Sequence, residues 1–195
     1  MFNFDETRKQ YNEFSDYEKW VKEGGYLCPS ALVKAIVPYL KGGERILDVA
    51  CGTGLVGEEL EKIGWQGKLI GVDIAEKRLK EAATKKIYSA CLLMDARNLN
   101  FQKKCFDVVL SCAFIGLVGP GPVRSMHYLV KPNGFLGCVA GACKCKKWSQ
   151  ANLKQAEKCL KSLYKTKVLL RQDLGSGYTS DLNHEYYVLY LLKCL

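Results

Sequence analysis

This sequence lacks the features that would place it across a membrane or around a structural metal. No stretch approaches the roughly 18 consecutive apolar residues of a membrane-spanning helix, and no basic-then-apolar leader opens the chain. Histidine occurs only at His127 and His184, and the 10 cysteines include no C-x-x-C pair. Zinc sites use such closely spaced ligands, so we expect no metal site and no membrane span.

Cysteine is abundant, but its placement does not indicate a disulfide scaffold. Cys51 lies between small residues, and Cys91, Cys112 and Cys138 lie in apolar runs, where a thiol behaves as a small apolar side chain. Disulfide-rich domains are typically short and secreted. We therefore expect free thiols in a reducing, cytoplasmic setting.

The chain shows no internal repeat, low-complexity tract or flexible linker that would separate two domains. Its 195 residues, 48% of them apolar, are enough for one complete core. We predict a single domain over residues 1–195. Residues 1–40, including a helix from Asp5 to Lys22, form a lid segment, and residues 41–195 form the core.

Apolar runs separated by helical patterns predict an α/β fold. The expected strands are Ile46–Asp48, Lys68–Asp73, Ala90–Met94, Phe106–Ser111, Phe135–Ala140, Lys167–Asp173 and Tyr186–Cys194. This alternation is typical of a doubly wound, mostly parallel seven-stranded sheet with helices on both faces. The last two runs, which have no helical pattern between them, predict an antiparallel C-terminal edge hairpin.

The most informative stretch is ILDVACGTGLVGEEL, from Ile46 to Leu60. An apolar run reaches Asp48, small residues follow, and a helical pattern begins. Gly52 and Gly54 allow a tight turn that brings bare backbone close to a ligand, towards which the first N–H groups of the helix point. We predict a loop that binds a nucleotide-type cofactor.

The same letters contain G-x-G-x-x-G through Gly52, Gly54 and Gly57, which is the dinucleotide fingerprint. Asp48 argues against that assignment, because a carboxylate here would repel a pyrophosphate. It suits a ligand with a cationic end, such as the ammonium of a methionine moiety. An NAD-dependent oxidoreductase remains the less favoured alternative.

Acidic residues end three successive predicted strands, at Asp48, Asp73 and Asp95. Asp73 lies about 20 residues beyond the glycine loop, where an acid can accept both ribose hydroxyls. Each acid alone could be a helix N-cap. Together, behind a glycine loop, they indicate a cofactor site at the carboxyl ends of the strands.

The loop resembles the D-x-G-x-G-x-G motif of Rossmann-like (class I) methyltransferases that use S-adenosylmethionine, with Ala50 replacing the first glycine. Phe106-Asp107-Val108-Val109 resembles their F-D-x-V motif. The segment Tyr11–Glu18 and the Tyr26-x-x-Pro29 pattern are most similar to the Williams-Beuren syndrome region methyltransferase-like protein twenty-seven group, with Phe14 where that group has tryptophan. The resemblance covers about residues 11–140.

The resemblance implies S-adenosyl-L-methionine as cofactor and S-adenosyl-L-homocysteine as product. The Asp95 carboxylate would face the adenine amine, and the backbone N–H of Ala96 would reach a ring nitrogen. The expected cofactor-binding residues are Tyr17, Asp48, Ala50, Cys51, Gly52, Thr53, Gly54, Asp73, Ile74, Asp95, Ala96 and Ser111.

The expected reaction is methyl transfer to a small-molecule acceptor by in-line displacement, which needs alignment more than acid–base chemistry. The loop 112–120 is apolar and glycine-rich, which suits a closed pocket. Tyr11, Tyr17, this loop and His184 are candidates near the methyl group, and no catalytic residue is assigned. Because the loop lacks an obvious base, a non-catalytic, regulatory S-adenosylmethionine-binding protein is the alternative.

Positive charge is concentrated in the second half of the chain. Residues 1–100 hold 15 basic and 15 acidic side chains, and residues 101–195 hold 14 and 5, which accounts for the net charge of +9. Lys154, Lys158, Lys161 and Lys165 line one face of a predicted helix. This face could bind nucleic acid or anionic lipid, but no aromatic residues interleave with the lysines. We expect a solvated surface and no specific nucleic-acid partner. The sequence does not indicate an oligomeric state.

Overall fold

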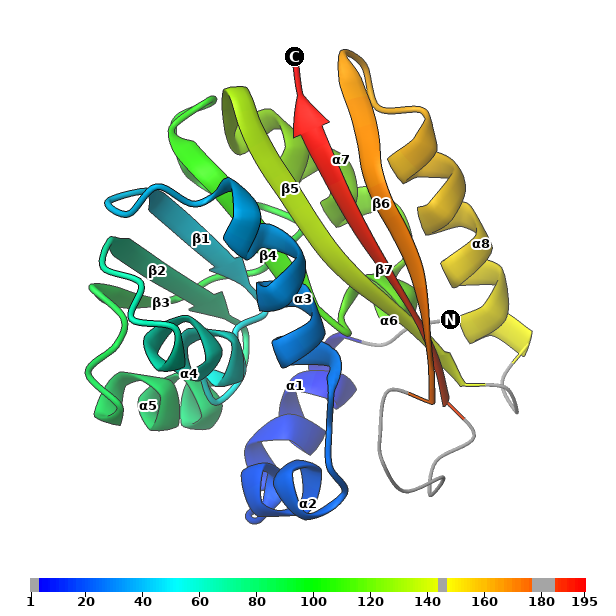
Figure 1. Cartoon of the computed structure of the whole chain (residues 1–195). Helices are drawn as coiled ribbons and strands as arrows, with labels where there is room; N and C mark the ends of the chain where they lie inside the picture. Colours follow the sequence, from blue (N-terminus) through cyan, green and yellow to red (C-terminus); the bar gives the residue numbers. More distant parts are fainter. Residues whose placement is uncertain (1–3, 144–146, 177–184) are drawn as a thin grey trace.

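The computed structural model describes residues 4–143, 147–176 and 185–195. Their strands form a seven-stranded sheet in the order β3-β2-β1-β4-β5-β7-β6 (Figure 1). The strands are β1 (Arg45–Val49), β2 (Lys68–Asp73), β3 (Ala90–Leu93), β4 (Phe106–Cys112), β5 (Val130–Cys143), β6 (Thr166–Gly175) and β7 (Glu185–Cys194). Pairing is parallel from β3 through β5, and β7 is antiparallel to both β5 and β6. The predicted fold class and its C-terminal hairpin are confirmed.

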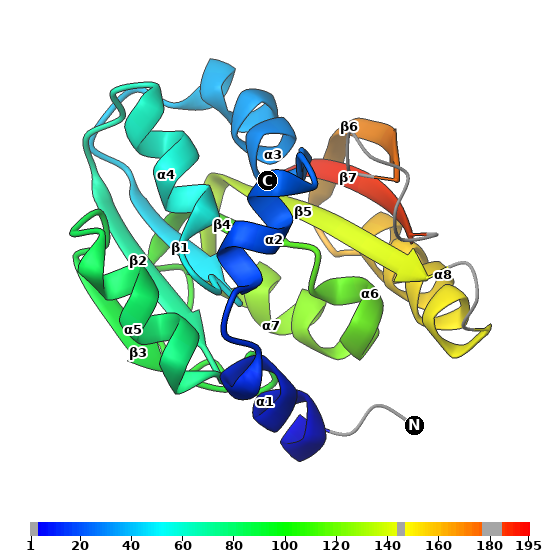
Figure 2. The same ribbon diagram turned by 90° about the horizontal axis from the view of Figure 1, so that it is seen from below.

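Helices cover both faces of this sheet. They are α1 (Phe4–Glu13), α2 (Tyr17–Glu23), α3 (Cys28–Ile36), α4 (Leu55–Lys62), α5 (Glu76–Thr84), α6 (Ile115–Val118), α7 (Gly121–Leu129) and α8 (Lys147–Lys161), with a 3-10 turn at Val37–Tyr39. Figure 2 shows α3, α4 and α5 on one face and α6, α7 and α8 on the other. Among the described helices, none is long and apolar enough to cross a membrane.

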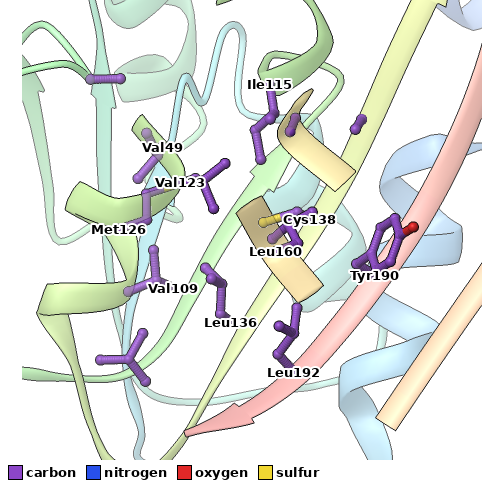
Figure 3. Packing of buried hydrophobic residues seen from close by; sticks show 14 of the residues in the cluster. Val49, Val109, Ile115, Val123, Met126, Leu136, Cys138, Leu160, Tyr190 and Leu192 are labelled. Carbon is purple, nitrogen blue, oxygen red and sulfur yellow. The ribbon is translucent and has the colours of Figure 1, made fainter. Parts of the chain in front are cut away.

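Strand β1 shows how alternation divides the core between the two faces. Leu47 and Val49 join the buried cluster that includes Val123 and Met126 of α7 (Figure 3), whereas Ile46 packs on the opposite face with α3 and α4. Successive side chains of a strand point to opposite faces. Asp48 therefore shares the face of Ile46, beneath α3 and α4.

The predicted lid helix, Asp5 to Lys22, is instead two helices, α1 and α2, separated by residues 14–16. The backbone carbonyl of Phe14 accepts a hydrogen bond from the guanidinium of Arg78 in α5. The Phe14 ring packs edge-on against Tyr17 and Trp20. These contacts anchor the chain at the break and explain why one continuous helix does not form.

Strand β5 begins earlier than predicted, at Val130 rather than at Phe135. Its pairing with β4 shifts register, from Phe106 opposite Val130 to Val108 opposite Phe135. Asn133 takes a left-handed conformation with φ of 65° within this shift. Residues 131–134, which precede the predicted strand, therefore form a local irregularity inside one long strand.

Candidate cofactor site

The glycine loop follows β1 and leads into α4 at the carboxyl edge of the parallel strands. Gly52 and Gly54 have φ values of 55° and 90°, and Gly54 is the N-cap of α4. Ala50 also has a positive φ, 58°. A left-handed conformation costs a residue with a Cβ roughly 1–2 kcal/mol. The backbone path of a glycine-rich loop is thus retained at Ala50 despite its methyl group.

A cavity of about 50 Å³ lies between this loop and the lid segment. It is lined by Tyr17, Tyr26, Pro29, Ala50, Cys51, Gly52, Thr53, Leu55, Val56 and Cys112. Pockets that hold ligands of cofactor size measure about 300–1,000 Å³. The cavity brings five of the predicted residues together, but it must widen before the cofactor can enter.

Asp73, at the end of β2, is joined to the glycine loop. Its Oδ2 accepts the backbone N–H of Gly52 and its Oδ1 accepts that of Ala75, each at 2.8 Å. Burial raises the pKa of this carboxyl, and the backbone hydrogen bonds oppose that rise. Each carboxylate oxygen has a second lone pair, so two ribose hydroxyls could still be accepted. The Asp73 site therefore fits the predicted role.

Asp48 lies in a different environment from the one expected of an ammonium ligand. It is fully buried, and its Oδ2 accepts the hydroxyl of Tyr88 at 2.7 Å. Among the described residues, its Oδ1 has no hydrogen-bond partner. Burial raises the pKa of this carboxyl to about 7. The structure does not place Asp48 in the cavity lining, because β1 alternation directs its side chain beneath α4.

At the end of β3, the carboxylate of Asp95 is held by Arg97. The guanidinium of Arg97 donates to both carboxylate oxygens, with Nε at 2.9 Å from Oδ2, and its backbone N–H donates to Oδ1 at 2.8 Å. Burial opposes the effect, but these bonds lower the pKa of Asp95. The carboxylate stays partly exposed and charged, as an acceptor for an adenine amine requires. Its neighbour Ala96 is buried.

The remaining predicted contacts lie close to the loop but outside the cavity lining. Ser111, at the end of β4, is fully buried, and its hydroxyl lacks a partner within the described ranges. Ile74 follows Asp73 and is half-buried, and Gly54 precedes α4. His184, a candidate from the sequence, lies outside the described residues.

The lid is joined to the core by four charged residues, which we call the lid cluster: Glu18, Lys22, Glu58 and Lys85. Glu18 of α2 contacts Lys85 at 2.8 Å and Lys22 at 2.6 Å. Lys85, at the end of α5, also contacts Glu58 of α4 at 2.6 Å. Although burial opposes it, the bonds to Lys22 and Lys85 lower the pKa of Glu18 to about 2. The cluster holds α2 next to the glycine loop.

A cation–π contact also joins the lid to the core. The guanidinium of Arg78 in α5 lies 4.9 Å from the ring centre of Tyr17 in α2. Tyr11 also packs edge-on against Tyr17, at 6.1 Å between ring centres. Of these candidates near the methyl group, Tyr17 lines the cavity.

The other wall of the cavity is uncharged. The Tyr26 hydroxyl and the Cys112 thiol form a hydrogen bond at 3.6 Å. The Tyr26 ring packs against Tyr187 of β7, with ring centres 6.0 Å apart. Burial raises the pKa of both Tyr26 and Cys112, so both groups are neutral near pH 7. Of the predicted loop 112–120, Cys112 is the residue that reaches the cavity.

Tyr88 is the residue that the sequence analysis missed. It precedes β3 and bonds both Asp48 and the backbone of Gly57. No local pattern marks it, because its partners lie 31 and 40 residues away in the chain.

Comparison with known proteins agrees with this geometry. Residues 46–134 match the family described as a methyltransferase domain. Together with the seven-stranded sheet and its glycine loop, this match supports a class I S-adenosylmethionine-dependent methyltransferase domain. The prediction of S-adenosyl-L-methionine as cofactor is confirmed.

Similar proteins differ in the acceptors that their names indicate. Aklanonic acid methyltransferase DauC from Streptomyces sp. (strain C5) is 39% identical over 74 residues, which is 35% of this chain and 34% of that protein. The eEF1A lysine and N-terminal methyltransferase from Mus musculus is 27% identical over 114 residues, 53% of this chain and 16% of that protein. The chain thus spans about a third or less of these relatives.

A solved structure shows the same fold. Geranyl diphosphate C-methyltransferase from Streptomyces coelicolor A3(2), in complex with Mg²⁺, geranyl diphosphate and S-adenosyl-L-homocysteine, superposes with a TM-score of 0.66. The alignment has 16% identity and covers 94% of this chain and 85% of that one.

Proposed function

We propose that this protein transfers the methyl group of S-adenosyl-L-methionine to a small-molecule acceptor. The observation that carries the proposal is the cavity between the glycine loop and the lid, with Asp73 bonded to the loop at its cofactor side. Opposite the loop, Tyr17, Tyr26 and Cys112 form an uncharged wall. We also propose that residues 1–195 act as one domain, with residues 1–40 as its lid.

When bound, the cofactor supplies a methyl group already activated on a sulfonium. The protein then has to hold the acceptor in line with that group and exclude water. Tyr17 and Tyr26 of the lid segment and Cys112 of the core are placed to do this. A general base is needed only for an acceptor that carries a proton at pH 7, and the lining includes no charged side chain to serve as one.

The choice of a small molecule is supported by the lining and by the names of DauC and geranyl diphosphate C-methyltransferase. The eEF1A relative makes a protein lysine the competing acceptor. A lysine substrate must lose its proton and is commonly held by acidic groups, which the lining lacks. Membership of the Williams-Beuren group also remains a proposal. So does a cytoplasmic location, which is supported by the eight free thiols found among the described residues.

A regulatory role without catalysis is the second candidate. Its support is the same uncharged lining, since none of the described residues that line the cavity is a base. An NAD-dependent activity is less favoured, because residues 46–134 match the family described as a methyltransferase domain.

The first test is a thermal-shift comparison of S-adenosyl-L-methionine, S-adenosyl-L-homocysteine and NAD. A ligand at 100 times its dissociation constant stabilises the folded state by about 2.7 kcal/mol. We expect stabilisation by the first two ligands, and stabilisation by NAD alone would refute the cofactor assignment for this protein.

The second test separates catalysis from binding. Labelled methyl donor is incubated with the protein and a metabolite library, and in parallel with a cell lysate resolved into protein and small-molecule fractions. Label in a small molecule supports the proposal, whereas label in protein identifies the competing acceptor. Cofactor binding with no transfer in either fraction supports the regulatory role.

A further inference from the structure

Tyr88 fills a space that three glycines leave open. A Cβ added at Gly54, Gly57 or Gly71 would lie 2.9 Å or less from an atom of the Tyr88 ring. Such separations are too short for carbon atoms in contact. Gly54 and Gly57 belong to the cofactor loop and the first turn of α4, and Gly71 belongs to β2. The ring therefore packs directly beneath the loop that binds the cofactor.

The hydroxyl of Tyr88 makes two hydrogen bonds in this position. It accepts the backbone N–H of Gly57 at 3.2 Å and donates to Oδ2 of Asp48 at 2.7 Å. The N-cap of α4 is Gly54, which has no side chain that could cap the helix. Tyr88 thus takes the role of a capping side chain from outside the helix.

This arrangement assigns different tasks to successive N–H groups of α4. The first N–H groups of a helix have no partner within the helix. Tyr88 occupies that of Gly57, the third residue of α4. Leu55 and Val56, which precede it, line the cavity. Their N–H groups stay available for a ligand while the turn behind them is held in place.

We propose that Tyr88 and Asp48 form a positioning pair that holds the cofactor loop in its binding conformation. This inference rests on the proposed function and deepens it. Asp48 acts on the cofactor through Tyr88 and the backbone of α4, and not by contact with the ammonium. When the loop is already in its bound conformation, cofactor binding does not include the free-energy cost of ordering it. The pair therefore raises cofactor affinity.

The charge of Asp48 decides how firmly the pair holds. The groups facing this carboxyl are acidic or neutral: Tyr88, Asp73, Cys51, Cys91 and Cys112. Within the described part of the chain, no basic group offsets its burial, which raises the pKa of Asp48 to about 7. Hydrogen bonds to a carboxylate are stronger than those to a carboxylic acid. The Tyr88 bond therefore weakens as pH falls through about 7.

The test compares the affinity of S-adenosyl-L-homocysteine for four forms of the full chain by calorimetry between pH 6 and pH 8.5. They are the unmodified protein, Tyr88→Phe, Asp48→Asn and the control Tyr164→Phe, in which an exposed tyrosine loses its hydroxyl. Tyr88→Phe keeps the ring and removes the two hydrogen bonds. We expect about a tenfold loss of affinity at pH 8 in Tyr88→Phe, the magnitude of a hydrogen bond to a charged group.

The pH profiles separate positioning from direct contact. The unmodified protein and Tyr164→Phe should lose affinity as pH falls below about 7, whereas Tyr88→Phe and Asp48→Asn should show little change over that range. If Asp48 contacted the ammonium, Tyr88→Phe would keep the pH dependence, and that result would overturn the inference. Failure of the unmodified protein to bind would instead count against the proposed function.

A readout without ligand completes the test. Hydrogen exchange at the Gly57 amide should accelerate about tenfold in Tyr88→Phe, while the amides of β1 and β4 keep their protection. Unchanged exchange at Gly57 would show that Tyr88 does not hold the loop. This measurement stands whether or not the protein transfers methyl groups.

Discussion

The carboxylate of Asp73 accepts the backbone N–H of Gly52 at 2.8 Å, joining the end of β2 to the loop 21 residues earlier in the chain. The same carboxylate accepts the N–H of Ala75, which starts the turn into α5. One side chain therefore orients the glycine loop, and in the proposed cofactor complex it would also present acceptors to the ribose. Loss of Asp73 should affect both the shape of the site and its contacts.

We expect Asp73→Ala to lower the affinity for S-adenosyl-L-homocysteine by well over tenfold. It removes two charge-assisted hydrogen bonds to the ribose, each worth about 1.5–3 kcal/mol, and releases the Gly52 N–H. Calorimetric titration measures the loss, and circular dichroism checks that the fold is retained. Asp95→Ala should cost less, because the Ala96 backbone donor would remain. Equal losses would contradict the assigned roles.

Ala50→Gly should increase the stability of the protein. Ala50 is held at a φ of 58°, which glycine adopts without strain. The gain should be up to about 1 kcal/mol, because the strain relieved exceeds the added freedom of the unfolded chain. Urea unfolding measures it. The matched control is Ala83→Gly at an exposed position of α5, which should lose about 1 kcal/mol.

Asp48 should make the protein less stable as pH rises. Its pKa is about 7 in the folded state against an ordinary value of 3.8, so the folded state binds the proton more tightly. The neutral carboxyl stabilises the folded state in full below pH 3.8, and this stabilisation is lost as pH rises through about 7. The free energy of unfolding should therefore be lower at pH 8 than below pH 3.8 by an amount of order 4 kcal/mol.

Asp48→Asn should remove that dependence. Relative to the unmodified protein, the variant should show the largest increase in free energy of unfolding at pH 8, a smaller increase at pH 5 and the smallest below pH 3.8. Chemical denaturation at several pH values gives both curves. A constant difference between them would mean that Asp48 does not titrate in this range.

Lys85→Met should accelerate cofactor entry. Lys85 bonds Glu18 of the lid and Glu58 of α4, so its loss weakens the lid cluster while keeping the apolar stem. Because the cavity of about 50 Å³ must widen, opening of the lid should limit association. Stopped-flow binding of S-adenosyl-L-homocysteine should show a several-fold faster association rate.

The control for Lys85→Met is Lys80→Met, which breaks an exposed pair with Glu76 on the same helix. Its association rate should stay unchanged. If both variants bind at the rate of the unmodified protein, the lid cluster does not govern entry.

Several features followed from local sequence because their physical basis is local. Alternating apolar residues predicted the strands, and Gly52 and Gly54 predicted a loop that only residues tolerant of positive φ can form. Asp73 could be assigned to the site because the carboxyl ends of parallel strands meet at one edge. The lysines of α8 were likewise expected at the surface, since Leu153 and Leu160 recur on the opposite, buried face.

Other features depended on contacts between distant segments. The break between α1 and α2 comes from Arg78, which lies 64 residues beyond Phe14. The lid cluster draws Lys85 to Glu18 across 67 residues. Neither contact leaves a periodic pattern, because each needs a single pair of side chains brought together by the fold.

Asp48 shows most clearly what sequence and tertiary structure each determine. The sequence by itself established an acid at the end of β1 beside a glycine loop. Whether that acid faces the ligand or the interior depended on strand alternation together with the position of Tyr88, 40 residues away. Only the folded chain places the Tyr88 hydroxyl at 2.7 Å from the carboxylate, where burial makes that hydrogen bond the main compensation for a charge removed from water.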